Sequence, residues 1–261
     1  MSPEPPYGQQ LILAAREMAR SVDALSFSPP TTHWYNPLDY AAQPHERYLA
    51  QWGSSRKRVL FLGMNPGPWG MAQTGVPFGE VTFVRDWMGI EGTVRAPSRQ
   101  HPKRPITGFA CTRSEVSGRR LWGLMRARFG SPDAFFSDHF VANYCPLVFM
   151  EESGRNRTPD HLTKKEAEPL FAACDRHLRR VIEILAPEWV IGVGKYAEGR
   201  LAAVVGAMVD PPRVGAILHP SPANPQANRA WEELATRALT ALGVWREGPE
   251  SASAASPPRQ Y

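Results

Sequence analysis

The sequence predicts an α/β fold in which helices cover both faces of a parallel sheet. Short runs of β-branched, aliphatic and aromatic residues alternate along the chain with segments whose apolar residues have helical spacing. Strands separated by helices in this way are typical of a parallel sheet, because a chain that joins parallel strands must cross over the sheet. The expected strands are residues 58–63, 140–147, 189–194 and 214–218.

A single domain is expected over residues 9–245. Neither an internal repeat nor a linker-like stretch interrupts residues 9–243, and a hydrophobic content of 43% is enough for a full core. Residues 1–8 are rich in proline, and residues 246–261 contain a low-complexity stretch of Gly, Pro, Ser and Ala. We therefore expect flexible tails at both ends.

The first part of the chain is expected to begin with a helix and to continue as extended, aromatic-rich chain. Leu11 and Met18 belong to an apolar stripe that predicts a helix over about residues 9–25. Four prolines interrupt residues 26–57, which we expect to be extended apart from a short helix near residues 45–52.

A loop rich in glycine and proline follows the first strand. Eight of the twenty residues from 61 to 80 are Gly or Pro, so the backbone is expected to be irregular and rigid at the same time. A connection of this length is usually functional, and open α/β sheets bind ligands beyond the carboxyl ends of their strands. A rigid structural connection is the alternative interpretation.

The central part of the chain is expected to alternate between helices and loops. Apolar residues recur with helical spacing in residues 80–90 and again in residues 114–129. The proline- and arginine-containing residues 91–113 and the polar residues 150–163 are expected to be loops.

The C-terminal part supplies the remaining helices. Pro169 suits the first turn of a helix that ends near residue 186, and another helix, ending near residue 206, follows the third strand. After a second rigid loop, Asn224 and Pro225 suit the N-cap and the first position of a last helix that runs through Leu242.

The charge distribution favours an anionic partner. The chain has a net charge of +5, and residues 92–130 hold nine Lys or Arg against a single acid, Glu115. A local excess of positive charge favours a polyanion, most often nucleic acid, and a merely solvated basic surface is the alternative. No apolar run is long enough for a membrane span, and we expect no secretory signal in the N-terminal residues.

The three cysteines, Cys111, Cys145 and Cys174, are an odd and widely spaced set. They form neither a disulfide framework nor a Cys-x-x-Cys metal pair, which predicts a reducing, intracellular compartment. Three thiolates are also too few for an iron–sulfur cluster that needs four.

Polar residues follow three of the expected strands at equivalent places. Asn65 follows the first strand, Asn143 lies near the end of the second, and His219 follows the fourth. Because parallel strands end at the same edge of a sheet, these side chains are expected to converge there. Taken singly, each asparagine has the alternative role of capping local backbone, and His219 that of a packed or surface residue.

Four motifs carry a more specific signal. They are Gly63-Met64-Asn65-Pro66-Gly67-Pro68, Pro77-Phe78-Gly79-Glu80, Asn143-x-Cys145-Pro146-Leu147 and His219-Pro220-Ser221-Pro222-x-Asn224-Pro225-Gln226-Ala227-Asn228. In this order they resemble the single-strand-selective monofunctional uracil-DNA glycosylase family, over roughly residues 24–243. The resemblance implies a uracil-DNA glycosylase-like fold, a three-layer α/β/α sandwich around a short four-stranded parallel sheet. It also implies excision of uracil and some oxidised uracils from DNA.

The resemblance implies base-binding roles for four residues. Phe78 would stack on a flipped base, although ordinary core packing is its alternative role. Asn143 would accept a hydrogen bond from uracil N3–H and donate one to O4, a pattern that cytosine reverses. Met64 and Gly67 would contribute backbone contacts, and Gly67 would leave room at C5 of the base.

Two further residues match the family's catalytic positions. Cleavage of the N-glycosidic bond builds negative charge on the departing base, which His219 would stabilise by a hydrogen bond to O2. Asn65 would orient the attacking water. An amide is no useful general base, so the reaction would depend on stabilising the leaving group. The motifs place no amine as a Schiff-base nucleophile, which predicts no strand cleavage, and neither metal nor other cofactor is expected.

The loop at about residues 220–229 is expected to enter the duplex and take the place of the flipped base. Ala223 stands where vertebrate members have Arg, which could favour single strands or weaken product binding. Trp69 stands where the family has Phe, next to the pocket. The residues expected to contact DNA are Pro220, Ser221, Pro222, Ala223, Asn224, Pro225, Gln226, Asn228 and Arg229.

The resulting prediction is a monofunctional DNA glycosylase that hydrolyses the N-glycosidic bond of uracil, and of some 5-substituted or deaminated bases, in single- and double-stranded DNA. It would initiate base-excision repair. A non-catalytic nucleic-acid-binding module with the same fold is the first alternative, and a hydrolase of small nucleosides the second. We expect a monomer without membrane association, located with the DNA: in the cytoplasm or nucleoid of a bacterium, or in the nucleus of a eukaryote.

Overall fold

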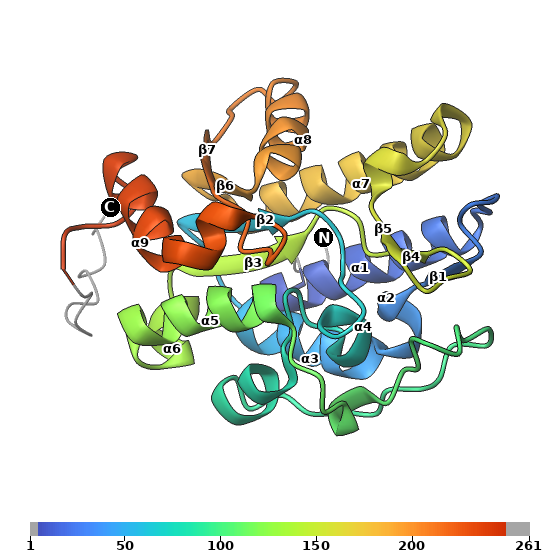
Figure 1. Ribbon diagram of the computed structural model, residues 1–261. Coiled ribbons are helices and arrows are strands. Elements are labelled where there is room, and N and C mark those ends of the chain that lie inside the picture. Colours follow the sequence, from blue (N-terminus) through green and yellow to red (C-terminus); the bar gives the residue numbers. More distant parts are fainter. Residues whose placement is uncertain (1–4, 249–261) are drawn as a thin grey trace.

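The computed structural model describes residues 5–248 and contains a four-stranded sheet in which all strands are parallel (Figure 1). Its order is β3-β2-β6-β7, so the apolar strand β2 lies inside the sheet and β3 forms one edge. The predicted three-layer α/β/α fold is confirmed. The strands are β2 (Val59–Gly63), β3 (His139–Asn143), β6 (Trp189–Val193) and β7 (Arg213–Ile217).

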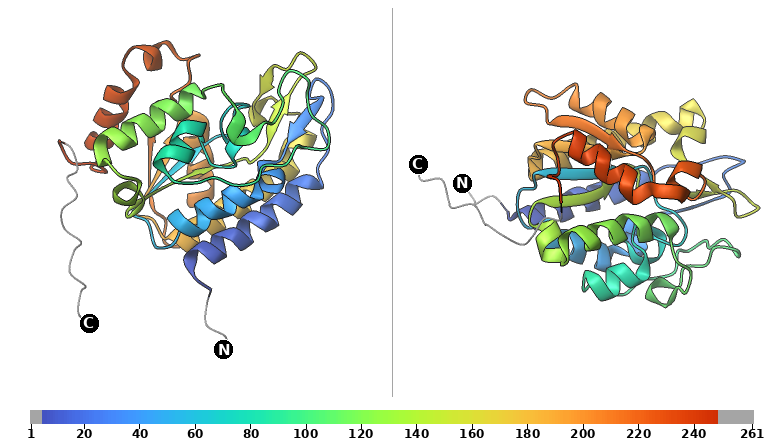
Figure 2. Two further views of the ribbon diagram at one scale, coloured as in Figure 1. Left: turned by 90° about the horizontal axis from the view of Figure 1, so that it is seen from below. Right: turned by 60° about the vertical axis from the view of Figure 1, so that its left-hand side comes forward.

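Helices cover both faces of this sheet (Figure 2). On one face α5 and α9 pack against each other, and on the other α1 packs against α3 and α7 while α8 packs on β6. The longer helices are α1 (Tyr7–Asp23), α3 (Ala42–Trp52), α5 (Val116–Phe129), α7 (Lys164–Leu185), α8 (Lys195–Val205) and α9 (Pro225–Ala241). The short ones are α2 (Pro37–Tyr40), α4 (Met71–Thr74) and α6 (Pro132–Phe136).

A second, antiparallel sheet was not predicted. It joins β1 (His33–Tyr35), β4 (Val148–Met150) and β5 (Asn156–Arg157) in the order β1-β4-β5. Its strands have only two or three residues, and β1 pairs with β4 across more than a hundred residues of chain, so no local pattern identifies the sheet. The sheet lies where extended chain and a polar loop were expected.

Helix α7 starts earlier than predicted. Thr163 and Glu166 form a capping box, so the helix begins at Lys164 and Pro169 lies inside it rather than at its start. The capping box provides partners for backbone N–H groups at the start of the helix. Pro169 is tolerated because its ring points back only toward the first turn of the helix. The expected helix after residue 80 is also irregular, because Phe83–Trp87 forms a π-helical turn.

The ends of the chain fall largely outside the described residues. The tails predicted for residues 1–8 and 246–261 include residues 1–4 and 249–261, which the structure does not describe. Between them, each helix is too short or too polar to cross a lipid bilayer.

The open edge of β3 is covered by α3. Tyr48 of α3 is fully buried, and its hydroxyl donates a hydrogen bond of 2.8 Å to the Val141 carbonyl of β3. Trp52, one turn further along α3, stacks on Phe136 with ring centroids 4.7 Å apart. An otherwise free strand edge is thus closed by a helix and a buried phenol.

We expect Tyr48→Phe to lower the free energy of unfolding by about 1–3 kcal/mol, because it leaves the buried Val141 carbonyl without a partner. Urea unfolding measures the change. The matched control is Tyr7→Phe, at the half-buried start of α1, where a change within about 0.5 kcal/mol is expected. Equal effects of the two substitutions would contradict this account.

Candidate active site

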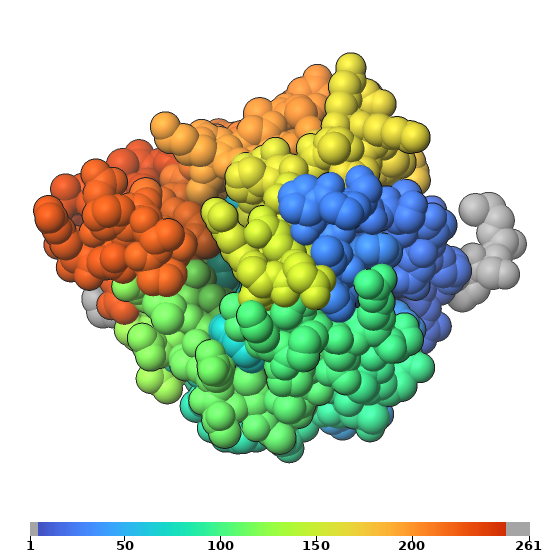
Figure 3. All heavy atoms as spheres, turned by 45° about the vertical axis from the view of Figure 1, so that its right-hand side comes forward, coloured from blue at the N-terminus to red at the C-terminus, as the bar shows by residue number. Residues whose placement is uncertain are grey.

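A cavity of about 330 Å³ opens at the carboxyl edge of the parallel sheet. Figure 3 shows the surface hollowed between the orange-red, yellow and light-green segments. The predicted residues Asn65, Asn143 and His219 all line the cavity, so the convergence expected from the strand ends is present. Its lining comprises Met64, Asn65, Pro66, Gly67, Met71, Phe78, Glu115, Ser117, Asn143, Asn156, Thr158, His219 and Ser221.

Gly63 at the end of β2 lets two of these side chains approach each other. It is the parallel partner of Asn143 in β3, and the pairing continues beyond the strands through a 2.9 Å bond from the Cys145 N–H to the Met64 carbonyl. A Cβ on Gly63 would lie 2.3 Å from Asn143 Oδ1 and 2.5 Å from the Phe78 ring. Only a residue without a side chain leaves both groups where they are.

Phe78 is held in a conformation that non-glycine residues rarely adopt. Its φ is 53°, and its ring is buried at one end of the cavity. Trp122 of α5 donates a 3.1 Å hydrogen bond to the Phe78 carbonyl, and Gly118 leaves room for that carbonyl, which would otherwise be 2.0 Å from a Cβ. Backbone strain fixed by surrounding contacts is common at functional sites.

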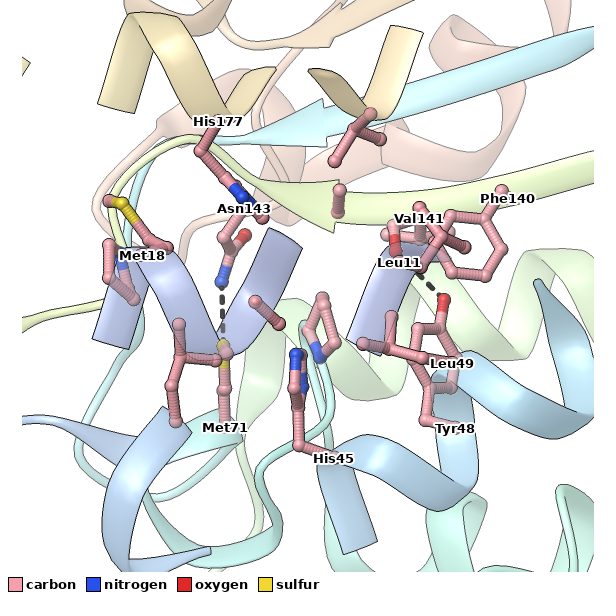
Figure 4. A pocket seen from close by; sticks show the side chains of 16 residues that line it. Leu11, Met18, His45, Tyr48, Leu49, Met71, Phe140, Val141, Asn143 and His177 are labelled. Carbon is pink, nitrogen blue, oxygen red and sulfur yellow. Dashed lines mark hydrogen bonds between the residues drawn. The ribbon is translucent and has the colours of Figure 1, made fainter. Parts of the chain in front are cut away.

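Asn143 lies between the large cavity and a smaller apolar one of about 40 Å³ (Figure 4). Its Nδ2 lies 3.3 Å from the sulfur of Met71. Figure 4 marks this contact with a dashed line. A thioether is a weak acceptor, so the carbonyl oxygen of a ligand in the cavity can replace the Met71 sulfur as the acceptor for Asn143 Nδ2. The carboxamide keeps one strong acceptor and its donors available for a ligand.

Asn65 has its amide nitrogen anchored to backbone. Nδ2 donates to the Leu147 carbonyl at 3.1 Å and to the Pro66 carbonyl at 3.4 Å. With both N–H groups directed at protein carbonyls, the side-chain oxygen is the part of Asn65 that can accept a hydrogen bond in the cavity.

His219 is fixed in one tautomer. Its Nδ1 accepts a 3.1 Å hydrogen bond from the Ser221 N–H, so this nitrogen carries no proton and Nε2 is the donor. Burial lowers the pKa of His219 to about 4, because the charged ring would lose its hydration. Gly194, with φ of 95°, packs against the His219 Cβ and leaves no room for a side chain.

Glu115 was not predicted as a site residue. It caps α5 by accepting hydrogen bonds from the N–H groups of Ser117 (3.1 Å) and Gly118 (3.0 Å), and it lines the cavity. Burial raises the pKa of its carboxyl group. A Cβ on Gly67 would lie 3.9 Å from this carboxyl group, so the space beside Gly67 ends at Glu115. The only signal in the sequence was a lone acid at the start of the helix predicted over residues 114–129.

The loop after His219 is shaped by Arg120 of α5. The guanidinium donates to the Pro220 carbonyl and to Asn228 Oδ1, both at 2.9 Å, and Asn228 in turn donates to the Pro222 carbonyl at 2.8 Å. Asn224 caps α9 by accepting from the Gln226 N–H at 3.0 Å, as predicted.

The residues predicted to contact DNA lie mainly at the rim of the cavity. Of that set, only Ser221 lines it, and Asn228 is engaged within the loop itself. Pro222 and Ala223 are exposed at the rim. Asn156 and Thr158 are further lining residues to which no role was assigned. They belong to the unpredicted sheet and the residue after it, which explains why their place was missed.

Residues 5–248 contain no cluster of three or more His, Cys, Asp or Glu side chains that could hold a metal ion. Two of the cysteines, Cys145 and Cys174, are buried, whereas Cys111 is partly exposed. The side chains that line the cavity offer amides, hydroxyl groups, thioethers, one imidazole, one carboxyl group and an aromatic ring.

The fold and this cavity have counterparts among known proteins. Residues 50–240 match the model of the Uracil DNA glycosylase superfamily. The crystal structure of wild-type Pedobacter heparinus SMUG2 is similar in fold, with a TM-score of 0.62 over 88% of this chain and 97% of that one at 19% identity. The protein thus belongs to a superfamily of α/β proteins whose members are named as DNA glycosylases.

Sequence relatives narrow the assignment. The rat protein named single-strand selective monofunctional uracil-DNA glycosylase is 50% identical over 220 residues, which are 84% of this chain and 79% of the rat protein. The bovine protein of the same name is 49% identical, over 84% of this chain and 81% of its own length. The chain therefore belongs to the single-strand selective monofunctional uracil-DNA glycosylase family, which confirms the resemblance seen in its motifs.

Gly63→Ala is expected to displace Asn143 and Phe78 and to lower the free energy of unfolding by about 1–3 kcal/mol, because its Cβ overlaps both groups. Chemical denaturation measures the change. Gly67→Ala is the matched control: its Cβ meets nothing closer than Glu115 at 3.9 Å, and a change within about 0.5 kcal/mol is expected. An unaltered stability of Gly63→Ala would refute the close approach.

We expect the His219 ring to stay neutral, with its proton on Nε2, at every pH above about 5. Its lowered pKa means that the ring binds a second proton only as the pH falls through about 4, well below its ordinary value of 6.5. Nitrogen-15 NMR of the imidazole, assigned with His219→Leu, reports both tautomer and titration. A midpoint near 6.5, or a proton on Nδ1, would contradict the assignment.

Proposed function

We propose that the protein is a monofunctional DNA glycosylase that hydrolyses the N-glycosidic bond of uracil in DNA and so initiates base-excision repair. One observation carries the proposal: the family's amide, histidine and aromatic positions lie around one cavity at the carboxyl edge of the sheet. Membership in the family supports the same activity.

The roles proposed for the base-binding residues follow from their geometry. Phe78 would stack on a flipped base, held by its strained backbone and Trp122. Asn143 would pair with N3–H and O4 of uracil, its donor moving from the Met71 sulfur to the base. Backbone at Met64 and Gly67 would complete the contacts, and the space between Gly67 and Glu115 would take substituents at C5.

The catalytic roles rest on Asn65 and His219. The Nε2–H of His219 would donate a hydrogen bond to O2 as negative charge develops on the leaving base. The imidazole would do so in its neutral form, so the free enzyme need not hold a buried positive charge there. The oxygen of Asn65 would accept a hydrogen bond from the attacking water and orient it. We propose hydrolysis without a covalent intermediate, and therefore no lyase step.

The proposed partner is DNA, which places the protein with the DNA of its cell. The loop at residues 220–229, which Arg120 braces, would enter DNA at the rim of the cavity. We propose that a monomer acts and that single and double strands both serve as substrates. A binding module without turnover has no need of a water-orienting amide and an Nε2–H donor in one pocket, so the enzyme is favoured.

The decisive measurement is a gel assay on labelled single- and double-stranded oligonucleotides with one uracil, with and without alkali. Wild-type protein is expected to yield strand breaks only after alkali. His219→Leu should lower the rate by about 10²–10³-fold and Asn65→Ala by at least about 10²-fold, because each removes an interaction made in the transition state.

Each other outcome of this assay has a definite meaning. Retarded but uncleaved DNA would support the binding module instead. Breaks without alkali would show a lyase nucleophile. Turnover of free deoxyuridine at a rate similar to that of DNA would favour the small-nucleoside hydrolase.

A further inference from the structure

Two arginines from a segment without an assigned role meet over one tryptophan. The guanidinium carbon of Arg113 lies 4.7 Å from the centroid of the Trp69 ring, and that of Arg104 lies 5.3 Å from it. Trp69 is partly exposed and comes two residues after Gly67, which lines the cavity. The three side chains, here called the Trp69 platform, thus border the site.

A buried amide fixes the platform's position. Gln73 is fully buried, and its Nε2 donates to the carbonyls of Pro68 (3.0 Å) and Pro105 (3.1 Å). Its Oε1 accepts from the N–H groups of Thr107 (2.9 Å) and Gly108 (3.1 Å). Gln73 therefore binds the residue before Trp69 to the residue after Arg104. Because all its hydrogen-bonding groups are satisfied, the two loops are joined rigidly.

The positive charges of the platform are not neutralised by the protein. Within residues 5–248 neither Arg104 nor Arg113 forms an ion pair. Arg104 donates to one neutral acceptor, the Lys103 carbonyl at 3.1 Å, while its covered Nε has no partner there. Both charges lie within about one Debye length of each other at 0.1 M salt (~10 Å). Their repulsion is relieved when an anion binds between or beside them.

The chemistry of such an anion is that of a phosphodiester. Guanidinium groups bind phosphate oxygens through paired N–H donors, and an aromatic ring behind them restricts their rotamers in advance. Both guanidinium groups already lie over the Trp69 ring, so the indole serves to support them and is not a free surface on which a base can stack.

We propose that Arg104 and Arg113, supported by Trp69, bind a backbone phosphate of the DNA strand next to the nucleotide whose base enters the cavity. This inference rests on the proposed function, because it places the strand by the position of the flipped base. It gives the Gly67 side of the cavity a phosphate contact separate from the loop at residues 220–229 on the His219 side.

The test measures binding of a uracil-free single-stranded oligothymidylate as a function of KCl concentration. Each phosphate contact contributes about 0.7 to the slope of log K against log salt on single strands. The variant Arg104→Gln with Arg113→Gln is expected to reduce this slope by about 0.7, the contribution of one phosphate, and to weaken binding at low salt about tenfold. Lysine at both positions should restore the slope, because it keeps the charge, and only part of the affinity, because it lacks the paired donors.

The control variant removes two arginines of similar setting at the other edge of the sheet. Arg213 lies over the Trp189 ring at 5.5 Å, at the start of β7, and Arg179 bonds the carbonyl of Ala207 just after α8. Arg213→Gln with Arg179→Gln makes the same change in net charge. We expect its slope to stay within about 0.2 of wild type if binding is local to the platform. An equal loss in both variants would show a general charge effect and overturn the proposal.

Uracil excision by the wild-type protein is measured on a single-stranded oligonucleotide in the same buffers. If wild type excises uracil and the platform variant keeps the wild-type slope, the phosphate contact is refuted while the proposed function stands. If the slope falls but wild type excises no uracil, the platform binds DNA and the proposed function fails.

Discussion

The organisation of the site depends on how closely the backbones of β2 and β3 can be joined at their carboxyl ends. At Gly63 the Asn143 carboxamide and the Phe78 ring both pack against a Cα that has no side chain. Hydrogen bonds from Tyr144 and Cys145 to Gly63 and Met64 extend the pairing past the last residues of both strands. The Asn143 carboxamide is thus positioned by the sheet itself, and the Phe78 ring packs against the end of β2 although Phe78 lies in the loop that follows this strand.

Desolvation gives the site its electrostatic character. The same enclosure that lowers the pKa of His219 raises that of Glu115, because burial disfavours the charged form of both groups. A neutral imidazole with a fixed Nε2–H suits a reaction in which negative charge develops on the leaving group, because its dipole is oriented before that charge develops. The Ser221 N–H sets this orientation from within the loop that follows the strand.

Polar side chains with several hydrogen-bonding groups connect the loops around the cavity. Gln73 joins the first Gly/Pro loop to the basic segment near residue 105, and Arg120 joins α5 to the loop that precedes α9. Gln73 bonds backbone carbonyls of both loops and N–H groups of the basic segment, whereas Arg120 bonds the Pro220 carbonyl and the Asn228 side chain. Loops that lack regular structure are made rigid by this means, and the charged rim of the cavity has a defined shape.

The sequence by itself determined the α/β class, the four strands, the convergence of Asn65, Asn143 and His219 at one edge, and, through four motifs, the family. These features are local or periodic, and strand ends in a parallel sheet meet at one edge whatever the loops do. Only the tertiary structure revealed the small sheet β1-β4-β5, the place of Glu115 in the cavity, and the meeting of Arg104 with Trp69. The pairing of β1 with β4, the approach of Glu115 to Gly67 and the contact of Arg104 with Trp69 all join segments distant in sequence, and no local pattern of residues encodes such contacts. The helix start at Lys164 is a different case, because the sequence contains the Thr163–Glu166 capping box that marks it. Pro169 also suits the first turn of a helix, but in this chain it lies inside α7.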